Sequence, residues 1–158
     1  MLDINQFRES IIKSTLNDLL LYSPEAEELL VFTCATESLG GTYIRQTHGP
    51  ALGIYQMEPQ TYTDIWANYL HNQNRLRMIL ITNFNVVNIP SPERMIYDLR
   101  YSTALARIFY ERVKEPLPKI DDVDNIWWYY KKFWNTDKGA ATKEHSIKLY
   151  EGFRGVAG

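Results

Sequence analysis

SPEAEELLVFTCATESLGG, residues 23–41, carries the signals of a helix at both of its ends. Ser23 is a favourable N-cap, Pro24 suits the first helical position, and the glutamates that follow are stabilised by the positive end of the helix dipole. Gly40 and Gly41 are typical of a helix end, because glycine readily adopts the left-handed conformation that closes a helix. We therefore predict a helix from about residue 24 to Ser38.

The segments on either side of this helix also have helical patterns. Apolar residues recur at three- to five-residue steps over residues 4–21, and a second Ser-Pro-Glu start at residues 91–93 predicts one long helix to about Val113. Residues 75–89 fit either a buried helical turn or a short strand, and residues 40–58 indicate a loop or small hairpin. The sequence thus predicts a mainly α fold, with further helices over about 59–70, 121–134 and 140–153.

The composition is that of one soluble globular domain. The chain has 158 residues, of which 45% are hydrophobic and 23% charged, so we expect a single domain spanning residues 1–158. A net charge of −2 does not suggest nucleic-acid binding, and no apolar run reaches the roughly 20 residues of a membrane span. Cys34 is the one cysteine and His48, His71 and His145 are scattered, so we expect no disulfide, no metal and no cofactor.

An aromatic segment, WWYYKKFWN, occupies residues 127–135. Helical spacing places Trp127, Tyr130 and Trp134 on one stripe, which predicts that they face the core. Trp128 and Tyr129 fall outside the stripe. They either pack against a neighbouring helix or line a groove.

Glu37 is the first candidate for chemistry. It lies near the end of the predicted helix, on a semi-apolar face with Thr33 and Cys34 and beside a glycine-rich break. A carboxyl half removed from water there would have a raised pKa, which is what a general acid near neutral pH requires. The alternative is a structural role, in which Glu37 caps a loop amide or pairs with Arg45.

The segment GPALGIYQMEP, residues 49–59, is the second candidate. Its glycines, Gly53 among them, let the backbone turn tightly and approach a ligand. Gln56 offers an amide and Tyr55 a flat ring, and polar groups beside aromatic faces suit a sugar. The alternative is a structural turn whose tyrosine belongs to the core.

Together these residues resemble the lytic transglycosylase and goose-type lysozyme superfamily. The family pattern is a Glu-Ser at a helix end, then Gly-x-x-Gln-hydrophobic-x-Pro, then an Ala-Tyr-Asn-like motif on a late helix. Here Glu37-Ser38, residues 53–59 and Phe133-Trp134-Asn135 occupy these places, the last with a poorer match. The short chain looks like a bacteriophage-encoded member, such as an endolysin.

The resemblance implies a lysozyme-like helical fold with a substrate cleft and cleavage of the β-1,4 bond between N-acetylmuramic acid and N-acetylglucosamine. Glu37 would be the acid, and then the base that closes a 1,6-anhydro ring. Ser38 would hold the acid loop, and the substrate contacts would come from the glycine-rich segment and the late motif, namely Gly53, Tyr55, Gln56, Glu58 and Asn135. The partner would be the peptidoglycan glycan strand, and we expect a monomer.

Two carboxylates leave the reaction type open. Glu58 or Asp64 could activate water and make the protein a hydrolytic muramidase, although each also fits a helix start or a surface charge. Two rivals come from other classes: a non-catalytic virion-associated protein that clamps wall glycans, and a structural protein whose aromatic helix docks a partner. The first residues, MLDINQFRES, lack the features of a signal peptide. We therefore expect synthesis in a host cytoplasm and action on the wall after release, or carriage in a virion.

Overall fold

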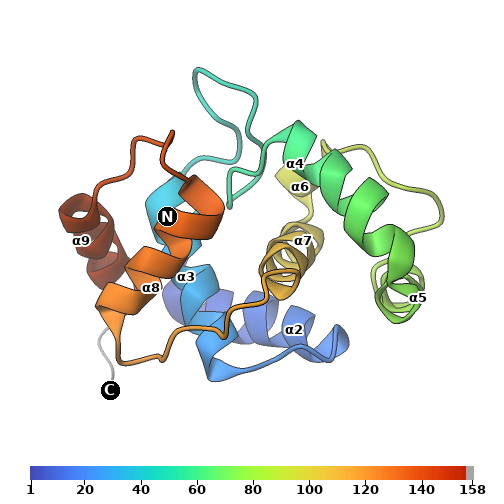
Figure 1. Ribbon diagram of the computed structural model, residues 1–158, viewed down its shortest axis with the longest axis horizontal. Coiled ribbons are helices and arrows are strands. Elements are labelled where there is room, and N and C mark those ends of the chain that lie inside the picture. Colours follow the sequence, from blue (N-terminus) through green and yellow to red (C-terminus); the bar gives the residue numbers. More distant parts are fainter. Residues whose placement is uncertain (156–158) are drawn as a thin grey trace.

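The computed structural model describes residues 1–155, and they are mainly helical, as predicted (Figure 1). An N-terminal helical segment consists of α1, a stretch of wider π-type turns (η1) and α2. Short helical pieces also follow α4 (η2 and η3) and α8 (η4). The bounds are α1 Ile4–Gln6, η1 Phe7–Lys13, α2 Ser14–Asp18, α3 Pro24–Ser38, α4 Pro59–Asp64, η2 Ile65–Tyr69, η3 Leu70–Asn72, α5 Asn74–Asn83, α6 Arg94–Tyr97, α7 Leu99–Glu111, α8 Val123–Tyr130, η4 Lys131–Asn135 and α9 Lys143–Phe153.

Helix α3 lies in the middle of the fold, and α7, α8 and α9 pack around it (Figure 1). Its predicted start is confirmed, because the Ser23 hydroxyl accepts a hydrogen bond from the Ala26 amide at 3.1 Å. Its end is also confirmed, although Leu39 rather than a glycine is the first residue in the left-handed conformation, with φ of 52°. Every residue from Ala26 to Ala35 is buried, which makes α3 the centre of the core.

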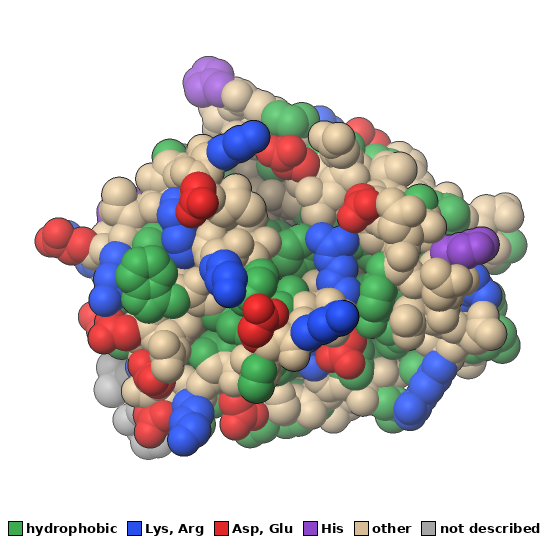
Figure 2. Space-filling model, viewed as in Figure 1, with side chains coloured by type: hydrophobic (Ala, Val, Ile, Leu, Met, Phe, Trp, Pro, Cys, Tyr) green, Lys and Arg blue, Asp and Glu red, His purple; other side chains and the backbone are tan. Residues whose placement is uncertain are grey.

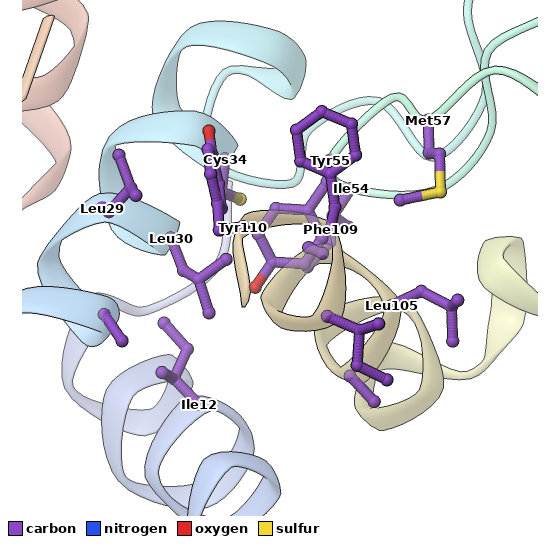
Figure 3. Close-up of a cluster of buried hydrophobic side chains, with 14 of the residues drawn as sticks. Ile12, Leu29, Leu30, Cys34, Ile54, Tyr55, Met57, Leu105, Phe109 and Tyr110 are labelled. Carbon is purple, nitrogen blue, oxygen red and sulfur yellow. The ribbon is translucent and has the colours of Figure 1, made fainter. Parts of the chain in front are cut away.

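The core lies chiefly between α3, α7 and the N-terminal helical segment (Figure 3). Leu30 and Cys34 from α3, Leu105 and Tyr110 from α7, and Ile12 from η1 are all essentially removed from solvent. The Tyr110 hydroxyl, which this cluster buries, is satisfied, since it lies 2.8 Å from the Thr33 hydroxyl. The two helices are therefore fixed against each other directly beneath the end of α3.

The structure corrects the predicted long helix after Ser91. Helix α6 ends at Tyr97 and α7 begins at Leu99, because Asp98 adopts an extended conformation and its carboxylate caps the Tyr101 amide at 2.9 Å. The Arg94 side chain supports this break through an ion pair with Asp98 at 3.0 Å. The ambiguous residues 75–89 contain the helix α5 rather than a strand.

Residues 40–58 form an irregular loop with two isolated bridges, Arg45 to Leu52 and Leu52 to Met57. This loop projects at the top of Figure 1, above the junction of α3 with α8. Among residues 1–155, none of the helices combines the length and the apolarity needed to cross a membrane.

The aromatic segment largely follows the prediction. Trp127 and Tyr130 are buried and Trp134 is half-buried. The two residues outside the stripe differ in burial. Tyr129 is buried, whereas Trp128 is 58% exposed.

Candidate active site

Glu37 lies in the last turn of α3, where the chain changes direction. The turn is fixed by Ser38, which is fully buried; its hydroxyl accepts from the Gly41 amide at 2.9 Å and donates to the Cys34 carbonyl at 3.1 Å. Ser38 therefore holds the segment that follows the acid, as the resemblance implies. It does not contact the cleft itself.

The carboxyl of Glu37 is partly buried and has one strong hydrogen bond. The Tyr130 hydroxyl donates to its Oε1 at 2.6 Å. Burial raises the pKa of Glu37 to about 7, and the Tyr130 hydrogen bond opposes that shift in part because it favours the carboxylate. Arg45, the cation expected in the structural alternative, pairs instead with Glu93 at 3.0 Å. No lysine or arginine within residues 1–155 forms an ion pair with Glu37.

Glu37 opens into a cleft of about 630 Å³. Figure 2 shows this face hollowed beneath the projecting 40–58 loop. The end of α3 forms one part of the cleft. The loop, η4 with the turn after it, and the start of α9 form most of the rest, together with single residues of α4, α7 and α8. The polar side chains along it are Thr36, Glu37, Gln46, Gln56, Glu58, Thr61, Asn135, Thr136, His145 and Ser146.

Gln56 shares this cleft with Glu37, as predicted. Its backbone has a φ of 52°, and its side-chain amide donates to the Gly53 carbonyl at 2.8 Å. Gly53 itself lies behind the cleft wall with a φ of 78°. A Cβ there would come within 2.5 Å of the Met95 carbonyl oxygen and 2.9 Å of the Ser102 hydroxyl, so only glycine fits. Gly53 thus shapes the loop and does not itself line the cleft.

Tyr55 does not line the cleft. Its ring is 1% exposed and packs beside Ile54 and Tyr110 in the core (Figure 3), and its hydroxyl lies 3.0 Å from that of Thr103. The prediction that Tyr55 forms an aromatic wall of the cleft is therefore wrong. Tyr55 belongs to the core, which was the alternative interpretation of the sequence. The physical reason is that the tight turn at Gly53 directs the following residues inward, where a large ring gains more from burial.

Asn135 lies in the cleft, held by a lysine. Lys131 donates to the Asn135 side-chain carbonyl at 2.6 Å and to the Gly139 carbonyl at 3.0 Å. The two bonds tie the end of η4 to the turn that follows it. The structure therefore brings Asn135 and Gln56 into the same cleft as Glu37, although the three come from segments far apart in the sequence.

The two carboxylates proposed as partners of Glu37 differ in position. Glu58 is exposed at the start of α4 and lines the cleft. Asp64 lies outside it. Hydrogen bonds from the Asn68 amide at 2.6 Å and from Arg112 at 2.8 Å lower the pKa of Asp64. Only Glu58 is thus placed to act in the same hollow as Glu37.

Tyr130 and His145 are among the cleft residues that the sequence did not identify. Tyr130 was expected in the core on the basis of its stripe, and its ring is buried, but its hydroxyl reaches Glu37. His145 was one of the scattered histidines, and it lines the cleft from the start of α9. A tyrosine on an apolar stripe has a polar end that must find a partner, and this was the available signal for Tyr130.

The arrangement supports proton transfer. A carboxyl with a pKa of about 7 can donate a proton near neutral pH and accept one in the next step. The described residues contain no cluster of three or more metal-ligating side chains. Cys34 is fully buried, and burial raises the pKa of its thiol to about 12, so it is not placed to act as a nucleophile.

No family model matches this chain, and comparisons with curated proteins and with solved structures found no match.

Proposed function

We propose that this protein cleaves the β-1,4 bond between N-acetylmuramic acid and N-acetylglucosamine in peptidoglycan, with Glu37 as acid and base. The observation that carries the proposal is the position of Glu37. Its carboxyl is partly buried, has a pKa near neutrality and borders a cleft of about 630 Å³. The motif order Glu-Ser, then Gly-x-x-Gln, supports the same assignment, because Glu37 and Gln56 occupy one cleft.

The reaction would begin with the protonated Glu37 carboxyl. Its proton moves to the glycosidic oxygen as the bond from that oxygen to C1 of the muramic acid breaks. The Glu37 carboxylate then removes the proton of the muramoyl 6-hydroxyl, and O6 bonds to C1. The product is a 1,6-anhydro ring, no water is consumed, and Glu37 recovers its proton. Tyr130 would stabilise the carboxylate between the two steps, because its hydroxyl already donates to Oε1.

Hydrolysis is the second candidate reaction, and the placement of Glu58 favours it. This carboxylate lines the cleft together with Glu37, whereas Asp64 is held by Arg112 outside it. A second carboxylate on the other side of the scissile bond could activate water and leave a reducing end. Glu58→Gln separates the two reactions: it abolishes a hydrolase that uses Glu58 and leaves a transglycosylase active.

The test is product analysis on purified sacculi. The wild type should release muropeptides, whose masses identify anhydro or reducing ends, and Glu37→Gln should fold normally and release almost none. Glu25→Gln is a matched control on the same helix, away from the cleft. Equal release by wild type and Glu37→Gln would contradict the proposal. Retention on sacculi with no release by either protein would favour a non-catalytic wall-binding protein, which would act after release from a host cytoplasm or from within a virion.

A further inference from the structure

We propose that the cleft is one end of a longer groove, which carries a neutral glycan strand from Glu37 around the aromatic helix to the exposed indole of Trp128. The inference rests on the proposed function and names a second, remote contact with its substrate. We call this path the glycan groove and define it by three hollows that share lining residues on η4.

The three hollows share walls. The cleft with Glu37 and a second hollow of about 660 Å³ are both lined by Thr61, Phe109, Trp134 and Thr136. A third hollow of about 530 Å³ lies between the outer face of α8 and the 115–119 segment, and it shares Phe133 with the second. The side chains therefore leave one winding surface rather than three separate sites.

The aromatic segment lines this surface from one end to the other. Asn135 lies in the cleft, Phe133 in the second and third hollows, and Trp128 in the third. A helical rise of 1.5 Å per residue puts Trp128 roughly 10 Å along the helix from Asn135. A ligand that contacts both ends must therefore extend along the helix.

The chemistry of the two outer hollows suits a sugar polymer. Each combines aromatic faces with side chains that bind hydroxyl groups: Trp134 and Phe133 with Thr63 and Asn68 in the second, and Trp128 with Asn125 in the third. Flat apolar faces next to fixed hydrogen-bonding groups are what a pyranose, with its apolar faces and equatorial hydroxyls, can use.

The charges favour a neutral strand over a phosphate polymer. Arg112 in the second hollow is paired with Asp64 at 2.8 Å, and Lys132 in the third lies 3.6 Å from Glu115. Lys119 also lines the third hollow, but Glu115 and Asp122 line it too, so its charges balance. A phosphate backbone requires an excess of basic side chains, which these two hollows do not offer.

Trp128→Ala tests the groove, because the indole is 58% exposed and its loss should leave the fold intact. Tyr97→Ala is the control, since Tyr97 is 76% exposed on α6 and lines none of the three hollows. Binding to purified sacculi is measured on ice by co-sedimentation, with both changes made in the Glu37→Gln protein. Trp128→Ala should weaken binding at least about fivefold, the effect of losing one aromatic anchor, and Tyr97→Ala should not.

Kinetics with substrates of two lengths test the path of the strand. In the otherwise wild-type protein, Trp128→Ala should slow release from sacculi but leave cleavage of a short soluble oligosaccharide unchanged within about twofold. Equal binding by Trp128→Ala and Tyr97→Ala would overturn the inference, as would an equal loss on long and short substrates. Failure of the proposed function gives a different result, because Glu37→Gln would then match wild type in muropeptide release. The difference in sacculus binding between Trp128→Ala and Tyr97→Ala would still show whether the glycan groove exists.

Discussion

The hydroxyl of Tyr130 sets the chemistry of the Glu37 carboxyl. The two oxygens lie 2.6 Å apart, and the hydrogen bond favours the ionised acid while burial favours the neutral one. Burial is the larger effect, so the acid keeps its proton up to about neutral pH. One phenol thus limits how far the pKa rises and fixes the direction in which the carboxyl points.

Tyr130→Phe should raise the pKa of Glu37 further, because the bond that stabilises the carboxylate is lost. A general acid must be protonated in the free enzyme, so kcat/KM falls as pH rises through its pKa. The alkaline limb of the pH profile should therefore move to higher pH, and kcat should fall about tenfold as orientation is lost. The neighbouring Tyr129→Phe is the control, since that hydroxyl donates to the Glu115 carbonyl. An unmoved limb in Tyr130→Phe would show that Tyr130 does not act on the acid.

Glu37→Gln should stabilise the protein at alkaline pH. The folded-state pKa of about 7 is above the ordinary value of 4.5, so the folded chain holds the proton more tightly than the unfolded chain. Below pH 4.5 the carboxyl is neutral in both states; above pH 7 the fold must carry a partly buried charge. The variant should gain about 1–3 kcal/mol over wild type at pH 8 and little at pH 4, as measured by urea unfolding. A gain that is the same at both pH values would contradict the raised pKa.

For individual residues, the sequence predicted the role of some side chains and not of others. Glu37 could be identified because its helix end and the following glycines are local signals. Tyr130 and Tyr55 could not be separated, since each is an aromatic residue in an apolar pattern, and only the packed fold decides which hydroxyl reaches the cleft. Tyr130 donates to Glu37, whereas Tyr55 is satisfied by Thr103 inside the core.

The 40–58 loop depends on one residue without a side chain. Gly53 has a φ of 78° and lies against the backbone of α6 and the start of α7, so the loop is pressed onto the scaffold there. Gln56 lies three residues on and is tied to the Gly53 carbonyl. The position of a cleft amide is thus set by a close backbone contact behind it.

Gly53→Ala should destabilise the protein by roughly 2–4 kcal/mol, from left-handed strain and from the 2.5 Å approach to the Met95 carbonyl oxygen. Gly152→Ala is the matched control. A Cβ there meets nothing within 4 Å, and alanine favours the helix α9, so stability should be unchanged or rise by up to about 1 kcal/mol. Thermal unfolding of both variants decides the matter, and a Gly53→Ala protein as stable as wild type would contradict this account of the loop.

The helices differ in how far local sequence determines them. Helix α3 could be predicted to within a residue, because Ser23, Pro24 and the glycines after Leu39 act within their own turns. The break between α6 and α7 was not predicted, although the Asp98 cap that makes it is a local signal. The local pattern does not show that the Arg94 side chain, which pairs with Asp98, also donates to the carbonyl of Phe84, 10 residues earlier.

The two ends of the described chain are joined by a buried ionic network on α3. Arg8 from η1 donates to Glu27 at 2.7 Å and to Glu28 at 2.9 Å, and both carboxylates are almost fully buried. Tyr150 from α9 donates to Glu28 as well. The N-terminal segment and α9 are therefore fixed to the same helix that ends at Glu37.

Arg8→Met should cost about 3–5 kcal/mol of unfolding free energy, because it leaves the buried Glu27 without its cation and Glu28 with only Arg154, at 3.8 Å. Lys13→Met is the control, since the Lys13–Glu9 pair lies on the surface and its loss should leave the urea midpoint unchanged. If both variants unfold at the same urea concentration, the network does not hold the fold together.

The cleft as a whole could not be predicted, because no local pattern states which segments meet. Glu37, Gln56 and Asn135 come together only once α3, the 40–58 loop and η4 are packed on α7 and α9. The resemblance to a family motif indicated that these three residues share a cleft. The continuation of the groove past Trp134 could be identified only from the packed structure.

The most direct test of the account is the titration of the Glu37 carboxyl itself. Carbon-13 NMR of side-chain carboxyl groups, with the Glu37 signal assigned by its absence in Glu37→Gln, gives the pKa of this one group. The account predicts a pKa of about 7 that rises in Tyr130→Phe. A value near 4.5, the same in both proteins, would contradict it.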